Sequence, residues 1–265
     1  MILHYDIQDI VPYINWLYFY HAWSMNGKSE TAKLQLRKDA EEMLRAWEGS
    51  YHTHAVFGLF DANSDGDDLI LGDKRLPMLR QQKPKKPGYP NLCLADFVRP
   101  VGKGKDKVGV FATSVDAELQ KAYLHDDYQR MLSQVLADRL AEGTAEKMHE
   151  EVRRNYWGYA PNERLTMEQT HNEQYQGIRP AVGYPSLPDT SINFILNELI
   201  DMKGIGIRLT ESGMMTPHAS VSGLMLAHPG SCYFELGRIG TDQINDYARR
   251  RGLPVELIRR FLKGV

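Results

Sequence analysis

The longest regular pattern in the sequence is helical and covers residues 117–153. Apolar side chains recur there every three or four residues and line one face: Leu124, Tyr128, Met131, Leu132, Val135, Leu136 and Leu140. Such a stripe is typical of an amphipathic helix packed against another layer. At a rise of about 1.5 Å per residue, this helix must cross much of the molecule. Gly143 interrupts it at a cost of about 1 kcal/mol relative to alanine.

Four shorter helices are predicted from the same periodicity. The first covers 29–49, and a second runs from about 190 to 203. A third begins at Thr241 and stops at Gly252, and Pro254 is well placed in the first turn of a last short helix. Three side chains could cap the second helix with an oxygen atom: Asp189, Thr190 and Ser191.

Short apolar runs predict the strands. They are 54–60, 92–98, 108–113, 205–210, 221–227 and 232–238. The links at 99–107 and 228–231 favour hairpins, because a parallel crossover needs about a dozen residues or more. We therefore expect an α/β (α+β) fold, with a mixed, largely antiparallel sheet and helices packed on it. With no linker between two halves, residues 1–265 are expected to form a single domain.

Charge and composition exclude several classes of protein. The formal net charge is −2, whereas a protein whose main partner is nucleic acid would show a clear basic excess. No apolar run approaches the roughly 18 residues of a membrane span, and the N-terminus does not resemble a secretory signal. Only two cysteines are present, Cys93 and Cys232, which favours a reduced, cytoplasmic compartment with both thiols buried.

Residues 61–68, DANSDGDD, match only the first half of a calcium-binding EF-hand loop. Gly72 stands where the bidentate glutamate should be, and the flanking runs look like strands. A polar hairpin turn is therefore the preferred interpretation.

Three other patterns are weak. His52 and His54 would share one face of a strand, but no third or fourth metal ligand is indicated by the sequence. Gly204 and Gly206 precede a predicted strand, which is the wrong context for a dinucleotide fingerprint and favours a turn. The basic loop with Lys83, Lys85 and Lys86 is interpreted as solvated surface, with protein docking as the alternative.

The segment 175–189, YQGIRPAVGYPSLPD, carries the most chemical information. Five of its residues restrict or free the backbone: Gly177, Pro180, Gly183, Pro185 and Pro188. Neither a helix nor a regular strand tolerates this spacing, so a shaped, rigid loop is predicted. Arg179 and Tyr184 project from it. An arginine on such a loop either grips a carboxylate or phosphate or pairs with an internal acid, and the residues alone leave both open.

This segment resembles the signature of the activation domain of cobalamin-dependent methionine synthases. Seven further segments resemble that family in the same order: YINWLYFYHAW, VFGLFDANSDGDDL, CLADFVRP, HDDYQRMLSQVLADRLAEGTAEKMHEEVR, YWGYAPNE, LTESGMMTPHASVSG and QINDYARRRG. The resemblance covers nearly the whole chain. It implies a C-shaped α/β domain built on a twisted antiparallel sheet, in agreement with the pattern of helices and strands.

The resemblance also implies a function. Domains of this family bind S-adenosylmethionine and support reductive methylation of oxidised cob(II)alamin, with the electron usually supplied by a flavodoxin. Cobalt is the nucleophile, so the domain positions the methyl donor and excludes water without a general base. The cobalamin would be carried by a methionine synthase core or another corrinoid protein.

The family's ligand contacts are carried over by position. Arg179 would grip the ligand's carboxylate, within a loop motif that continues at Gly183 and Tyr184, and Gly183 would let backbone come close to the ligand. Backbone groups of three residues would meet the nucleoside: Pro180, Ala181 and Val182.

Three further positions belong to the implied site. Tyr233, followed by Phe234, could place a ring near the sulfonium, where cation–π attraction is worth about 0.5–2 kcal/mol. Ordinary strand packing is the alternative for this pair, and one of the two rings must face the core. Glu142 matches an acid in the long helix, and a solvated helix face is its alternative role.

Several positions depart from the family. Asn15 replaces an acid expected beside the ligand's ammonium, which would weaken binding by about tenfold if a charge-assisted hydrogen bond becomes neutral. Thr190 stands where a histidine often faces the corrin, and 211–217 lacks an aromatic pair. These departures keep open an alternative, in which the chain is a non-catalytic module that senses S-adenosylmethionine or serves in assembly.

No corrinoid-binding motif of the form D-x-H-x-x-G occurs in the chain. The sequence therefore predicts that cobalamin arrives on another polypeptide or on another part of a longer one. That encounter would be weak and reversible, because it must alternate with other reactions at the same corrin.

Overall fold

The computed structural model describes residues 1–84, 86–121 and 123–262, and Lys85 of the predicted basic loop falls outside them. Within these ranges, six strands form an antiparallel sheet in the order β4-β3-β2-β5-β8, with β1 also paired to β2. The strands are β1 (Ile2–Asp6), β2 (His52–Asp65), β3 (Asp68–Leu71), β4 (Lys74–Pro77), β5 (Asp106–Val115) and β8 (Ser220–Met225). A separate two-stranded ribbon pairs β6 (Arg208–Leu209) with β7 (Met215–Thr216).

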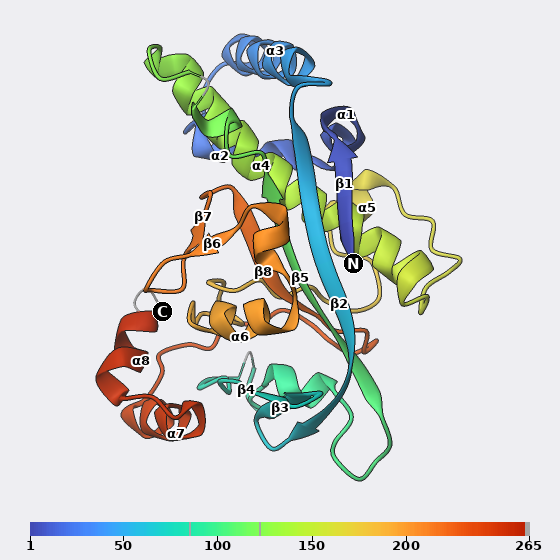
Figure 1. Ribbon diagram of the computed structural model, residues 1–265, viewed down its shortest axis with the longest axis vertical. Coiled ribbons are helices and arrows are strands. Elements are labelled where there is room, and N and C mark those ends of the chain that lie inside the picture. Colours follow the sequence, from blue (N-terminus) through green and yellow to red (C-terminus); the bar gives the residue numbers. More distant parts are fainter. Residues whose placement is uncertain (85, 122, 263–265) are drawn as a thin grey trace.

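The long strand β2 joins the two ends of the molecule (Figure 1). Its first half pairs with β1, in the register Ile2↔Val56, and its last residues pair with β3, in the register Ala62↔Leu71. Strand β5 follows nearly all of the opposite edge, from Thr53↔Val115 to Ala62↔Asp106. The result is a curled antiparallel sheet, which confirms the predicted fold class.

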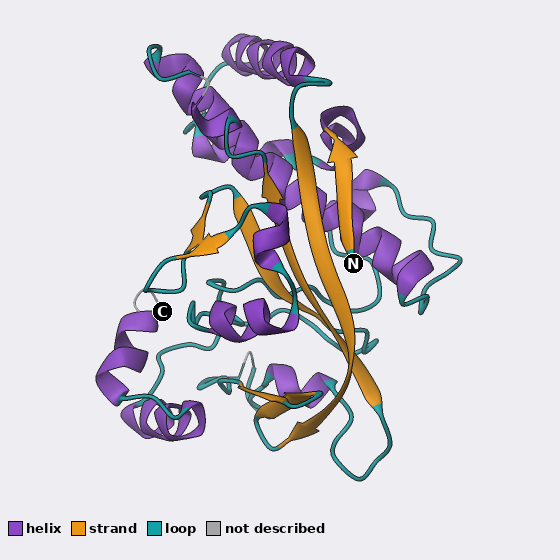
Figure 2. Cartoon of the chain, in the orientation of Figure 1, coloured by secondary structure: helices purple, strands orange, loops and turns teal. Residues whose placement is uncertain are grey.

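Both faces of the sheet are buried (Figure 2). Successive side chains of a strand point to opposite faces, so Phe57 and Phe111 join one apolar cluster while Val56 and Val110 join the other. The first cluster includes the long helix α4 (Asp127–Glu151), and the second includes α6 (Ile192–Leu199) and α7 (Thr241–Arg251). Burial on both faces explains why the strands read as continuous apolar runs.

The predicted long helix is confirmed, but it begins later than its sequence pattern. Asp126 accepts a hydrogen bond from Gln129 N at 2.9 Å and caps α4, which continues into a π-helical turn over Val152–Tyr156. A Cβ atom on Gly143 would lie 2.9 Å from Ile10 Cγ2, so the glycine permits close packing of the N-terminal segment.

Three members of the predicted buried stripe are exposed instead: Leu124, Tyr128 and Met131. Leu124 precedes α4. The first turns of α4, which carry Tyr128 and Met131, lie beside α3 (Glu30–Trp47), beyond the end of the sheet (Figure 1). The stripe from Leu132 onward is buried as predicted, apart from the half-buried Val135.

The other predicted helices are present as α3, α6, α7 and α8 (Val255–Phe261). Ser29 Oγ caps α3 by accepting from Ala32 N at 3.2 Å. Helix α6 is shorter than expected. Its N-cap residue, Ser191, makes no side-chain capping bond among the described residues, and Asp189 Oδ1 accepts from Ser191 N at 2.8 Å. Three short helices complete this set: α1 (Ile7–Ile10), α2 (Trp16–Ala22) and α5 (Met167–His171).

Two strand predictions are wrong, and a third is only partly correct. Residues 92–98 contain a 3₁₀ turn, Leu94–Phe97, because the Asp96 carboxylate accepts from Cys93 N at 2.8 Å and closes a local cap. Residues 232–238 are irregular, and of 205–210 only Arg208–Leu209 is a strand. The hairpins expected across 99–107 and 228–231 are therefore also wrong, since each has only one strand as an arm. The turn at 65–68 between β2 and β3 is confirmed, with Gly66 at φ 60°.

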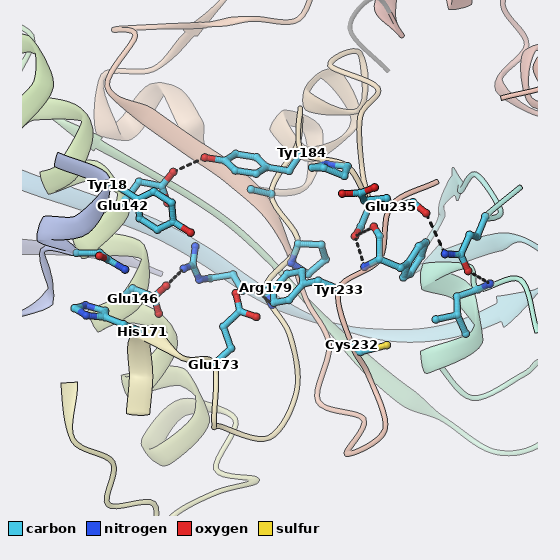
Figure 3. Close-up of a pocket in the computed structure, with 18 of the residues that line it drawn as sticks. Tyr18, Glu142, Glu146, His171, Glu173, Arg179, Tyr184, Cys232, Tyr233 and Glu235 are labelled. Carbon is cyan, nitrogen blue, oxygen red and sulfur yellow. Dashed lines mark hydrogen bonds and ion pairs between the residues drawn. The ribbon is translucent and has the colours of Figure 1, made fainter. Parts of the chain in front are cut away.

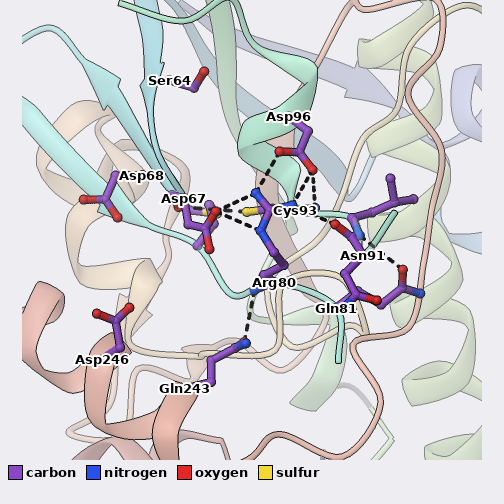
Figure 4. A network of polar contacts seen from close by, with 12 residues as sticks. Ser64, Asp67, Asp68, Arg80, Gln81, Asn91, Cys93, Asp96, Gln243 and Asp246 are labelled. Atoms are coloured by element: carbon purple, nitrogen blue, oxygen red, sulfur yellow. Dashed lines mark hydrogen bonds and ion pairs between the residues drawn. The ribbon is translucent and has the colours of Figure 1, made fainter. Parts of the chain in front are cut away.

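An ion-pair network around Arg80 ties the lower part of the molecule together (Figure 4). Its side chain bonds Asp67, Asp96 and the Asn91 carbonyl, while its backbone N–H donates to Gln243 Oε1 of α7 at 3.0 Å. The side-chain contacts are local, and the hydrogen bond to Gln243 links this segment to α7, 163 residues further along the chain.

Candidate functional site

A cavity of about 940 Å³ lies between α4 and two irregular segments, 179–186 and 232–237. Further residues come from the N-terminal helices, from α5 and from 81–84. Figure 3 shows side chains from these separate segments converging on one space. Because the contributors are far apart in sequence, the fold as a whole forms the cavity.

The predicted rigid loop docks along the free edge of β8. Ile178 and Leu226 exchange two backbone hydrogen bonds of 2.9 Å, and Val182 N donates to Ser222 O at 2.9 Å. A Cβ atom on Gly223 would lie 2.2 Å from the Pro180 carbonyl oxygen, so only glycine permits this approach. The loop is therefore held by the sheet while its side chains remain available to the cavity.

Arg179 lies in the cavity wall and is only 7% exposed. Its Nη2 donates to Glu146 Oε1 on α4, and its backbone N–H donates to Tyr233 Oη at 2.9 Å. Burial is the largest influence and acts to lower the pKa of this guanidinium, but Glu146 together with Tyr175, Tyr233 and Glu142 outweighs it, so the pKa lies above the ordinary value. The sequence left open whether Arg179 grips a ligand or pairs with an internal acid. In the structure it lines a cavity and also pairs with an internal acid, Glu146.

Three glutamates surround this arginine (Figure 3). Glu146 and Glu142 lie one turn apart on α4, and Glu142 Oε1 accepts from Tyr184 Oη at 2.7 Å. Glu173 follows α5 in a left-handed conformation, with φ 55°. Burial raises the pKa of the Glu173 carboxyl, and the charge of Glu146 adds to the shift while Arg179 opposes it. The cavity therefore offers one buried cation among several acids.

Eight of the ten predicted site residues line this cavity: Asn15, Glu142, Arg179, Pro180, Ala181, Tyr184, Tyr233 and Phe234. The other two predicted residues do not. Val182 packs against the apolar core, and Gly183 has φ 90° in a turn where its N–H donates to Leu187 O at 2.8 Å. An added Cβ on Gly183 would meet no described atom within 4 Å, so a turn and not crowding requires this glycine.

Several of the predicted site residues also make contacts within the protein. Asn15 Oδ1 accepts from Leu17 N at 3.1 Å and caps α2, so this oxygen is already engaged. Phe234 is buried in the core while Tyr233 is 37% exposed, so one ring of the pair faces the core as expected. Thr190, where the family often has a histidine, donates through Oγ1 to Ser212 O at 2.8 Å and is not among the cavity-lining residues.

Sequence reasoning missed four charged residues of the cavity: Arg139, Glu146, Glu173 and Glu235. A signal existed for Glu146, because it stands four residues after Glu142 and so shares a helix face with it. No signal pointed to Glu173, whose position depends on a turn after α5. Lys83 and Pro84 of the basic loop also line the cavity.

His52 and His54 both lie beside Asp116. His54 Nε2 lies 2.9 Å from Asp116 Oδ1, and His54 Nδ1 lies 2.8 Å from His4 Nδ1. Across the described parts of the chain, no group of three or more His, Cys, Asp or Glu side chains is arranged to hold a metal ion.

The thiols differ from each other. Cys93 is buried, and burial raises its pKa to about 12, so it is inert at neutral pH. Cys232 is exposed at the cavity, which corrects the expectation that both are buried.

No helix in the described ranges is long and apolar enough to cross a membrane.

Comparisons with known proteins agree on one family. Residues 6–252 match the family described as vitamin B12 dependent methionine synthase, activation domain. Among solved structures, the crystal structure of a MetH reactivation domain bound to AdoHcy superposes with a TM-score of 0.91. That chain is 40% identical in sequence, and the match covers 99% of this chain and 89% of that one.

Proposed function

This chain belongs to the family of vitamin B12-dependent methionine synthase activation domains, and from that premise we propose that it binds S-adenosylmethionine in the cavity beside α4. The observation that carries the proposal is the convergence of eight predicted contact residues on one cavity. The similar reactivation domain binds AdoHcy, the molecule that S-adenosylmethionine becomes after losing its methyl group. We also propose that residues 1–265 form one domain.

The size and charges of the cavity suit this ligand. Its volume of about 940 Å³ lies within the range of about 300–1,000 Å³ common for small-molecule sites. S-adenosylmethionine carries one carboxylate and two cationic groups, an ammonium and a sulfonium. Arg179 provides the cation for the carboxylate, and the acids Glu142, Glu146 and Glu173 provide a negative environment for the two cations.

The ring of Tyr233 is the aromatic group proposed to lie near the sulfonium. Its hydroxyl oxygen accepts from Arg179 N at 2.9 Å, so the ring and the loop are held together. Pro180 and Ala181 offer backbone groups to the nucleoside from a loop anchored to β8. Positioning of this kind lowers the barrier to methyl transfer by ordering the reactants beforehand.

The methyl acceptor is proposed to be cobalamin carried by methionine synthase modules or another corrinoid protein. When reduced, it supplies a cobalt nucleophile, so no proton moves and this chain needs no general base. Tyr18 and Tyr184 line the cavity yet are 56% and 52% exposed, which marks where the cavity meets the surface. This mouth is the proposed contact with the corrin.

Calorimetry and a reductive-methylation assay test the proposal together. The protein should bind S-adenosylmethionine, and it should produce methylcobalamin only with a cobalamin-loaded synthase core and a flavodoxin-type reductant. It should not methylate homocysteine alone. Absence of ligand binding would refute the proposal while leaving the family assignment intact.

One observation favours a second candidate, a module that senses the ligand or serves in assembly without reactivating cobalamin. Asn15 replaces an acid, and its oxygen caps α2, so the charge expected near the ligand's ammonium is missing. Binding of S-adenosylmethionine without formation of methylcobalamin would support this second candidate.

A further inference from the structure

An ion pair between Arg179 and Glu146 lies in the wall of the cavity. Only one side-chain nitrogen of Arg179, Nη2, donates to a described residue, and its acceptor is Glu146 Oε1. Arg179 Nε and Glu146 Oε2 are both buried and have no hydrogen-bond partner among the described residues. A buried arginine with so few partners is held by its one acid.

The groups behind the pair offer Arg179 no second acid as a partner, because Glu163 there is bonded to Arg153. His149, one turn further along α4, is fully buried, and burial holds its pKa well below the ordinary value, with the Arg153 and Arg179 charges acting in the same direction. Arg153 is also fully buried, but it bonds Glu163 and stacks over Tyr175 at 4.1 Å from the ring centroid. Taken together, these groups therefore carry no net negative charge.

The other acids that line the cavity are Glu142, Glu173 and Glu235. Glu142 accepts from Tyr184, and no hydrogen bond joins Glu142 or Glu173 to Arg179 within the described ranges. Among the residues that the structure describes, Glu146 is thus the one acid that hydrogen-bonds the Arg179 side chain.

We propose that Glu146 is a positioning residue, which holds the Arg179 guanidinium in the cavity wall so that its remaining N–H donors meet the ligand's carboxylate. This inference rests on the proposed binding of S-adenosylmethionine. Glu146 acts through Arg179, so it affects only ligands that carry a carboxylate. Without the Glu146 charge, a buried and unpaired guanidinium turns toward water and leaves its binding geometry.

The test compares two ligands that differ in one group. Decarboxylated S-adenosylmethionine keeps the nucleoside, the sulfonium and the ammonium but lacks the carboxylate. By calorimetry, Glu146→Gln should weaken binding of S-adenosylmethionine by about tenfold, as expected when a charge-assisted hydrogen bond becomes neutral. The decarboxylated ligand should lose less than about twofold, because it never meets Arg179.

Two controls separate positioning from general damage. Glu151→Gln makes the same chemical change on α4, at a residue that accepts from Tyr5 Oη outside the cavity, and should leave both affinities unchanged. In an Arg179→Ala background, Glu146→Gln should cause no further loss, since its effect passes through that arginine. If Glu146→Gln does not fold, Glu146→Asp keeps the charge on a shorter side chain and should cause a smaller loss, again only for the carboxylate ligand.

Each alternative outcome overturns the inference. Equal losses for the two ligands would mean that Glu146 only supports the fold. Tighter binding of S-adenosylmethionine by Glu146→Gln would mean that Glu146 competes with the ligand for Arg179. Failure of the wild-type protein to bind either ligand would instead refute the proposed function on which the inference rests.

Discussion

Arg80 and Arg179 are both paired with acids, yet their hydrogen bonding differs. All five side-chain N–H donors of Arg80 have acceptors: Nε bonds Asp67, Nη1 bonds Asn91 O and Asp96, and Nη2 bonds Asp67 and Asp96, at 2.5–2.9 Å (Figure 4). Hydrogen bonding to Asp96, followed by Asp67, raises the pKa of this guanidinium despite its partial burial. No donor is left over for a ligand.

Arg179 is more deeply buried but less well satisfied. Its Nη2 meets Glu146, its Nε has no partner among the described residues, and the side chain lines a cavity (Figure 3). An unsatisfied buried donor costs free energy. Within the described ranges, Arg153 and Arg251 also carry one, so what distinguishes Arg179 from them is that its side chain lines the cavity. The contrast separates an arginine that holds the fold together from one that is prepared for a ligand.

The largest expected effect is on ligand binding by Arg179→Ala. Removing the guanidinium should weaken binding of S-adenosylmethionine by at least about 30-fold, or about 2 kcal/mol, because a desolvated charge-assisted contact is lost. Calorimetry measures this at a temperature where the variant is folded, because the largely buried Glu146 loses its partner and the melting temperature should fall as well. Unchanged affinity would break the comparison, since the ligand's carboxylate would then bind elsewhere.

Arg80→Ala should lower the stability of the protein and leave its affinity for S-adenosylmethionine nearly unchanged. Losing five hydrogen bonds should lower the free energy of unfolding by about 2 kcal/mol, less than for a fully buried pair because Asp67 and Asp96 are each about one-third exposed. Urea denaturation measures the loss. Affinity for S-adenosylmethionine should stay within about twofold of wild type, and a larger change would show that the network also shapes the cavity.

The Arg179 region should also make stability depend on pH through His149. The folded-state pKa of this histidine is depressed, so the unfolded chain takes up a proton that the native protein does not. Stability should therefore fall as the pH drops below about 6.5, by at most about 1.4 kcal/mol per pH unit. His149→Gln should flatten this slope, whereas the exposed control His125→Gln should not. An unaltered slope in His149→Gln would assign the dependence to other groups.

The smallest expected effect is a gain. Asn15→Asp restores an acid near the proposed ammonium position and should tighten binding by several-fold, or about 1 kcal/mol. Aspartate caps helices as well as asparagine does, so α2 should be unaffected. Titration calorimetry against Asn15→Ala, which loses the cap and gains no charge, provides the contrast. No gain would indicate that Glu142, Glu146 or Glu173 already serves the ammonium.

Much of the fold follows from local patterns. The apolar stripe of α3 and the turn before β3 were predictable because helix period and turn chemistry act over a few residues. Residues 92–98 and 232–238 were not, although both read as strands. The Asp96 side chain closes a local cap in the first, and Ser186, about 50 residues away, binds the backbone of Phe234 in the second.

The candidate site, like the fold, has features that the sequence predicted and features that only the tertiary structure revealed. By itself, the sequence determined that 175–189 is a rigid loop presenting Arg179 and Tyr184, because proline and glycine restrict the backbone wherever they occur. Only the tertiary structure decided that Arg179 pairs with Glu146 and that Glu173 lines the same cavity. The same holds for Asn15, whose side-chain oxygen caps α2. Residue types specify which bonds a side chain makes. Packing specifies which partners come within reach, and for Arg179 the partner lies 33 residues away on a helix placed by the whole sheet.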